Sequence, residues 1–226
     1  MENTYPKFYA LEEAKQARIV NAAMKEFCHG YNQAKTDNIT QAAGISKGLL
    51  FHYFGTKENL YDFLIAYAVA TIQAEYVDKI NTHQADILES VWQMSLLKQD
   101  LAQHFPALFD FLTATYMDTR HSLNPAQKAR LVTFQAMRNK VLAEMLAACD
   151  KTLFREDVDP RKALEIIEWT LAGCAEGMAA RAAAAAADGS VSYADLGEEA
   201  RNNYTLYLTE FKSYLDIFRR CFYRNK

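Results

Sequence analysis

The chain has 226 residues, of which 50% are hydrophobic, and is long enough to bury a substantial core without disulfide bridges. A formal net charge of -3 gives the whole molecule no attraction to phosphate, so nucleic-acid binding would need a local cluster of basic residues. The four cysteines are widely spaced and form no C-x-x-C pair. We find neither a signal peptide nor a run of about 18 apolar residues, and we expect a reduced, cytoplasmic protein outside membranes.

Prolines mark the starts of several expected helices. Asn124 and Asp159 directly precede prolines, and each side chain can accept a backbone N–H of the first helical turn. No segment alternates cleanly enough for a strand, and residues 188–190 interrupt an alanine-rich helix, so we predict an all-α chain. In chain order, helices are expected at residues 10–29, 37–43, 47–53, 57–80, 85–103, 106–118, 125–149, 160–187 and 195–222.

The stretch from Thr36 to Lys57 has the pattern of two short helices joined by a tight turn. Thr36 is expected to cap the first helix, and Gly44 to end it, because glycine tolerates a positive φ. Ser46 can cap the second helix by accepting a backbone N–H. Two helices joined in this way form a helix-turn-helix, whose second helix enters the major groove of DNA.

The second of these helices has an inward and an outward face. Leu50 and Phe54 are four residues apart and should face the core. No acidic residue lies between Asp37 and Glu58, as a surface that approaches phosphate requires. The outward residues expected toward DNA are Lys47, Gly48, Leu49, Phe51, His52 and Tyr53.

The string from Gly44 to Leu60, GISKGLLFHYFGTKENL, closely resembles the N-terminal DNA-binding domain of TetR-family regulators. The helix before it resembles the family's first helix in the spacing of Ile19, Ala22 and Phe27, and the whole resemblance spans residues 14–65. It implies a three-helix DNA-binding head with a helix-turn-helix (residues 1–57) and a larger helical body for ligand binding and dimerisation (residues 58–226).

The resemblance also implies a partner and a set of contacts. The partner is double-stranded DNA carrying a pseudo-palindromic operator, which a homodimer would bind as a ligand-released repressor. Tyr53 and Lys57 are expected on phosphate rather than on bases. The contact residues that the resemblance implies are Thr36, Ser46, Lys47, Gly48, Phe51, His52, Tyr53 and Lys57.

Two positions depart from the family's pattern. Leu49 stands where the family usually has threonine, and Phe51 where it usually has tyrosine, so two hydroxyl groups are missing. Apolar contact with thymine methyl groups remains available to both side chains, which predicts a preference for T-rich half-sites. Alternatively, Phe51 belongs to the core of the head.

Aromatic and methionine side chains in the middle helices of the body suit a small, largely apolar effector. A plain hydrophobic core would have the same composition. The pattern therefore supports the presence of an effector site more strongly than it supports any individual residue of that site. The residues proposed to contact the effector are Trp92, Phe109, Tyr116, Phe134, Met137, Trp169 and Met178.

The last predicted helix carries a stripe of large apolar residues with heptad-like spacing. Such a stripe can pack inward within one chain or against a second copy, and both interpretations remain open. The residues proposed for a dimer interface are Tyr204, Leu208, Phe211, Leu215 and Phe218.

Other chemistry has little support. Glu26 and His29 form one E-x-x-H, whereas a di-metal bundle needs two, so we expect no metal and no cofactor, and Asp/His pairs such as Asp100 and His104 are better explained as ion pairs. We find no catalytic motif and expect no enzyme. An interaction or ligand-binding protein without a DNA role, and a transcriptional activator, remain as alternatives.

Overall fold

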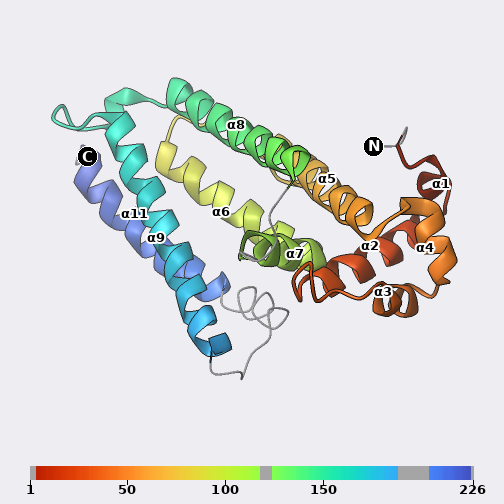
Figure 1. The fold of residues 1–226 in the computed structure, drawn as a ribbon. Helices are drawn as coiled ribbons and strands as arrows, with labels where there is room; N and C mark the ends of the chain where they lie inside the picture. Colours follow the sequence, from red (N-terminus) through yellow and green to blue (C-terminus); the bar gives the residue numbers. More distant parts are fainter. Residues whose placement is uncertain (1–3, 118–123, 188–203, 225–226) are drawn as a thin grey trace.

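The structure is a computed structural model that describes residues 4–117, 124–187 and 204–224. Their regular structure is helical, apart from an isolated bridge between Phe154 and Tyr223. Figure 1 shows α1–α4 at one end of the molecule, α9 and α11 side by side at the other, and α6 and α8 between them. The helices are α1 Pro6–Tyr9, α2 Glu13–Phe27, α3 Thr36–Ala43, α4 Lys47–Phe54, α5 Lys57–Glu75, η1 Val77–Lys79, α6 Ile87–His104, α7 Pro106–Met117, α8 Pro125–Ala148, η2 Lys151–Leu153, α9 Pro160–Ala187 and α11 Tyr204–Phe222.

The predicted fold class is confirmed, and the prolines account for much of the helix pattern. Each of the four prolines begins a helix, namely α1, α7, α8 or α9. Asn124 caps α8 through a capping box with Gln127, and Asp159 accepts the Arg161 N–H at 2.9 Å. These local signals placed the helix starts within a few residues of where they lie.

Two expected helices have different bounds in the structure. The segment 10–29 is α-helical only from Glu13 to Phe27, because the chain turns at Glu12, where ψ is 141°. Gln16 Nε2 donates to the carbonyl groups of Tyr9 and Leu11 at this turn. The segment 57–80 ends as α-helix at Glu75 and continues as the short helix η1. Residues 188–203, which include the expected break and the start of the last expected helix, lie outside the described residues.

The described side chains form two hydrophobic cores. The first core joins α1–α5 to α7 and the end of α6, with Phe8, Phe63 and Phe111 completely or almost completely buried. The second core joins the start of α6 to α8, α9 and α11, and includes Met145 and Phe211. The short helices of the helix-turn-helix are therefore held by the same core as α7. Within the described residues, we find no helix with the length and hydropathy needed to cross a membrane.

Candidate nucleic-acid interface

The α3–turn–α4 unit has the geometry that its sequence predicts. Gly44 ends α3 in the left-handed region with φ 67°, where a side chain would be strained. Ile45 packs against the first core, and Ser46 Oγ accepts the Leu49 N–H at 3.2 Å. Leu50 and Phe54 are buried, which turns the opposite side of α4 toward solvent. The predicted helix-turn-helix is confirmed as a structural unit.

The start of α3 differs from the prediction. Lys35 occupies the N-cap position, and Thr36 is the first helical residue, so the expected Thr36 cap is wrong. A carboxylate from α2 replaces it, since Glu26 Oε1 accepts the Lys35 N–H at 2.7 Å and Asn38 Nδ2 at 3.1 Å. No local pattern predicts this cap, because Glu26 lies nine residues before the group that it binds.

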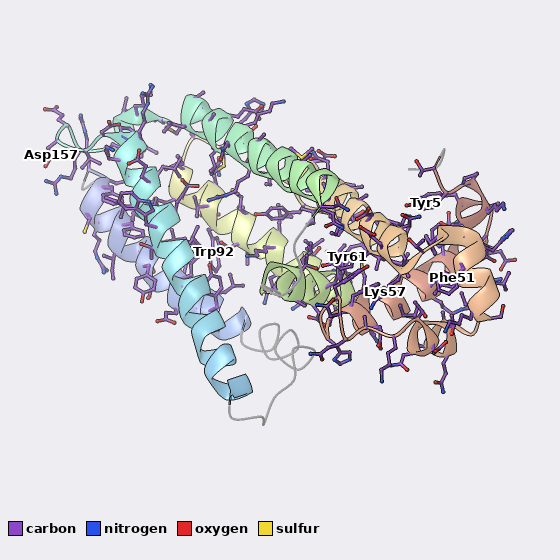
Figure 2. The ribbon with its side chains drawn as sticks, in the orientation of Figure 1. Tyr5, Phe51, Lys57, Tyr61, Trp92 and Asp157 are labelled. Carbon is purple, nitrogen blue, oxygen red and sulfur yellow. The ribbon has the colours of Figure 1, made fainter. Side chains whose placement is uncertain are left out.

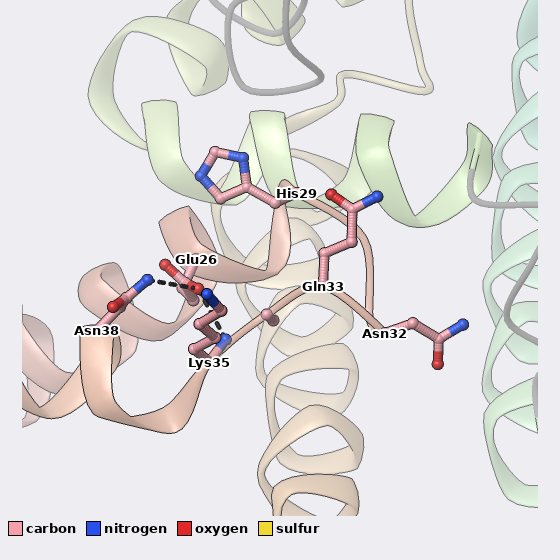
Figure 3. A pocket seen from close by; sticks show the side chains of 7 residues that line it. Glu26, His29, Asn32, Gln33, Lys35 and Asn38 are labelled. Carbon is pink, nitrogen blue, oxygen red and sulfur yellow. Dashed lines mark hydrogen bonds between the residues drawn. The ribbon is translucent and has the colours of Figure 1, made fainter.

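A polar hollow of about 520 Å³ opens beside this cap. Figure 3 shows the Glu26 carboxylate inside it, with its hydrogen bonds directed to α3. These hydrogen bonds of the Glu26 carboxylate hold α3 against α2. The side chains around the hollow are Glu26, His29, Asn32, Gln33, Lys35 and Asn38.

The outward side of α4 is open to solvent at four of its predicted contact positions. Lys47, Gly48, Leu49 and His52 are exposed, as is the cap residue Ser46. Leu49 is 38% exposed, which is unusual for a large apolar side chain in this protein. Exposed leucine at this position remains available for thymine methyl groups.

Three other predicted contact residues are half-buried. Thr36 lies at the start of α3. Tyr53 packs against the first core, and its ring makes an edge contact with His52 at 5.9 Å between centroids. Phe51 faces neither fully inward nor fully outward (Figure 2). These three side chains are less accessible to a ligand than the exposed residues of α4.

Lys47 already has an anionic neighbour. Its Nζ lies 2.8 Å from Asp37 Oδ1 at the start of α3, and both side chains are more than half exposed. An exposed pair of this kind contributes little to stability and is weakened by salt. A DNA phosphate would therefore compete with Asp37 for the Lys47 ammonium.

Lys57 makes contacts within the head that were not predicted, and its phosphate contact stays a prediction. Its Nζ donates to the Ala34 carbonyl at 2.6 Å and lies 4.8 Å from the centroid of the Tyr31 ring (Figure 2). Burial lowers the pKa of this ammonium, although Glu26 partly opposes the shift. Because the carbonyl and the ring hold the ammonium inside the head, Lys57 braces the loop before α3 against α5.

We expect Lys57→Met to lower the free energy of unfolding by about 1–2 kcal/mol, since it leaves the carbonyl of the buried Ala34 without its donor and removes a cation–π contact. Urea unfolding measures this change, and Lys35→Met, at an exposed side chain, is the matched control. If the variant unfolds like the parent but binds DNA more weakly and with less salt dependence, Lys57 contacts a DNA phosphate and does not stabilise the head.

The residues proposed to contact an effector are not all inside the body. Trp92 is half-buried beside the second core, with Lys212 Nζ 5.1 Å from its ring centroid, and Phe109 and Met137 are also half-buried. Trp169 is 69% exposed and does not lie in the interior of the single chain, so its contact with an effector stays a prediction. The side chains of Tyr116, Phe134 and Met178 lie outside the description.

The apolar stripe of α11 packs inward. Leu208, Phe211 and Leu215 are at most 5% exposed, and Phe218 packs partly against the second core. Side chains that are buried in their own chain offer little surface to a second copy, and the proposed dimer interface stays a prediction. The side chain of Tyr204 lies outside the description. Heptad-like spacing could not distinguish the two cases, because core and interface demand the same periodicity.

Residue chemistry and fold together define a helix-turn-helix DNA-binding protein. Residues 19–63 match the family model described as bacterial regulatory proteins, tetR family. This match covers the segment that contains the helix-turn-helix. No curated protein sequence matches the chain.

Solved structures extend the likeness over nearly the full length. A TetR family transcriptional regulator from Chloroflexus aurantiacus J-10-FL is 18% identical, covers 97% of this chain and 98% of its own, and has a TM-score of 0.62. Ketosteroid transcriptional regulator KstR2 of Mycobacterium tuberculosis is 18% identical over 95% and 97%, with a TM-score of 0.54. FadR from Bacillus subtilis, in complex with stearoyl-CoA, is 17% identical over 83% and 96%, with a TM-score of 0.52. At these identities the likeness establishes the fold alone.

Proposed function

We propose that the protein is a repressor that binds a pseudo-palindromic operator as a homodimer and releases it when a small molecule binds the body. The observation that carries the DNA role is the exposed surface of α4, where Lys47, Gly48, Leu49 and His52 project from a helix-turn-helix without a carboxylate on the same helix. The proposal places the protein in the cytoplasm together with the operator and assigns it no catalytic role. In this proposal residues 1–57 form the DNA-binding unit and residues 58–226 the body.

The dimer contact is proposed on the outer side of α9 and α11. Of the four large apolar side chains that are exposed in the described residues, three lie on these helices: Ile166, Trp169 and Ile217. α9 and α11 pack against each other at the end of the molecule away from α4 (Figure 1). An exposed apolar surface on two adjacent helices is suited to a symmetric contact with a second copy.

We expect Trp169→Glu to raise the dimer dissociation constant about hundredfold, because a large aromatic contact is replaced by a charge in both copies. Sedimentation equilibrium measures the change, and Lys140→Glu, on the exposed side of α8, is the control. If the variant dimerises like the parent, the dimer interface does not include Trp169 and lies elsewhere.

Selection of bound double-stranded DNA from a random pool tests the function as a whole. The expected product has two half-sites separated by about 34–36 Å or a multiple of that distance, with thymine opposite Leu49. Binding without sequence selection, or to a single half-site with G/C pairs alone, would contradict the proposed reading of DNA.

A further inference from the structure

The fold brings an acidic residue to the exposed surface of α4 from outside the acid-free stretch of sequence. Asp37 stands at the edge of that stretch, in the first turn of α3. Because α3 and α4 pack in contact (Figure 1), Lys47 Nζ lies 2.8 Å from Asp37 Oδ1. The Asp37 side chain is 72% exposed and that of Lys47 is 53% exposed. The surface proposed to approach DNA therefore carries a carboxylate beside its ammonium.

The backbone that carries the Asp37 carboxylate is well fixed. The Asp37 carbonyl accepts the hydroxyl of the buried Thr40 at 2.9 Å. On either side of Asp37, the Lys35 N–H and the Asn38 side chain both donate to Glu26 of α2. An acidic group near a helix N-terminus also interacts favourably with the helix dipole. Asp37 is thus stabilised at this place independently of Lys47.

Lys47 has no such support from its own helix. It is the first residue of α4, where the helix dipole disfavours a cation. The first turn of α4 also contains no acidic residue. The ammonium therefore depends on an acceptor from outside α4, and Asp37 supplies one in the protein without DNA.

The two kinds of DNA contact place different demands on this ion pair. A phosphate carries a negative charge, so Lys47 would have to leave Asp37 to bind it, and Asp37 would repel the same phosphate. The O6 and N7 atoms of guanine are uncharged acceptors. Because an ammonium has three donors, Lys47 can bind guanine and keep its bond to Asp37. The pair therefore opposes contact with the DNA backbone more than contact with a base.

We propose that Asp37 determines specificity by holding Lys47 for a guanine of the operator and by weakening its binding to phosphate. Non-specific binding comes almost entirely from phosphate contacts, so a carboxylate at this place lowers it selectively. Asp37 is a positioning residue in this role, because it acts through Lys47. The inference rests on the proposed function, in which α4 reads an operator, and it adds a guanine opposite Lys47 to the thymine expected opposite Leu49.

Asp37→Asn tests the proposal, because asparagine keeps the size of the side chain and removes its charge. Fluorescence anisotropy of the full chain measures binding to the selected operator and to a scrambled duplex of the same composition. We expect the variant to bind the scrambled duplex about tenfold more tightly, with a salt dependence steeper by about one to two phosphate contacts, while its operator affinity does not rise. The ratio of the two affinities should therefore fall about tenfold. Thermal unfolding should not change, because the pair is exposed.

Glu58→Gln is the matched control, since it removes the same charge from another exposed residue of the head. Any gain in affinity that the two variants share comes from the change in net charge. In a Lys47→Met background, Asp37→Asn should behave like Glu58→Gln, because the partner of Asp37 is then missing.

Equal gains of Asp37→Asn on both duplexes would overturn the inference, as would a change in the affinity ratio no larger than that of Glu58→Gln. A selected half-site without a G·C pair would overturn it as well. In each of these cases the parent still selects an operator, so the proposed function stands. If the parent selects no sequence at all, the proposed function fails and this inference fails with it.

Discussion

Asp86→Ala is expected to lower the free energy of unfolding by about 3 kcal/mol, because one carboxylate joins the start of α6 to the end of α11. Its Oδ1 accepts the N–H groups of Leu88 and Glu89 at 3.0 and 3.2 Å, and the Tyr223 hydroxyl at 2.8 Å. Its Oδ2 accepts Arg219 Nη1 at 2.6 Å. Alanine removes the helix cap and leaves Arg219 and Tyr223 without their acceptor. Denaturant unfolding followed by circular dichroism measures the loss.

The pH dependence of stability provides a second measurement at Asp86. Burial alone would raise the pKa of this carboxyl, but the hydrogen bonds from Arg219, Tyr223 and the backbone lower it below its ordinary value. A lowered folded-state pKa means that the stabilisation is complete above the ordinary pKa of about 4 and is lost as pH falls through the folded-state value. The free energy of unfolding of Asp86→Ala should therefore not show the fall at acid pH that the Asp86 carboxyl causes in the parent.

Asp157→Ala is the matched control for Asp86. Asp157 also receives an arginine hydrogen bond at 2.6 Å, from Arg155, but both side chains are about half exposed or more (Figure 2). An exposed pair usually contributes less than about 1 kcal/mol, so this variant should unfold almost like the parent. Equal losses from the two substitutions would show that the contacts of Asp86 with α11 add nothing to the cap.

The helix-turn-helix was predictable because its determinants are local. Gly44 ends α3, Ser46 caps α4 and Thr56 caps α5 by accepting the Asn59 N–H at 3.0 Å. Each of these residues acts on a group within a few positions of itself, so its chemical type is enough to indicate the backbone geometry. The fold class followed for the same reason, since the prolines and caps that define the helices are also local.

The contacts that sequence reasoning missed join distant segments. Glu26 caps α3 from another helix, and Lys57 binds a carbonyl group 23 residues earlier, so neither contact has a signature in the neighbouring sequence.

Gly48→Glu is expected to weaken operator binding about hundredfold or more while leaving the fold intact. Gly48 is exposed in the first turn of α4, and a Cβ at this position would meet only Ser46 Oγ at 4.0 Å. Replacing glycine inside a helix favours folding by about 0.5–1 kcal/mol, and an acidic group near a helix N-terminus adds to that. Toward DNA the same carboxylate repels phosphate, and in a dimer it does so at both half-sites. Fluorescence anisotropy with labelled operator measures the affinity, and thermal unfolding measures the stability.

Gly48→Gln separates charge from size in this experiment. Glutamine has nearly the same shape as glutamate, so any loss of affinity that both variants share comes from the added side chain and not from its charge. The further loss in Gly48→Glu should shrink as salt rises, because screening weakens the repulsion between the carboxylate and the phosphates. If the two variants bind the operator equally well at low salt, the N-terminal turn of α4 does not approach the DNA backbone. The reading surface would then have to be placed further along the helix, around His52 and Tyr53, where one side chain is exposed and the other packs against the core.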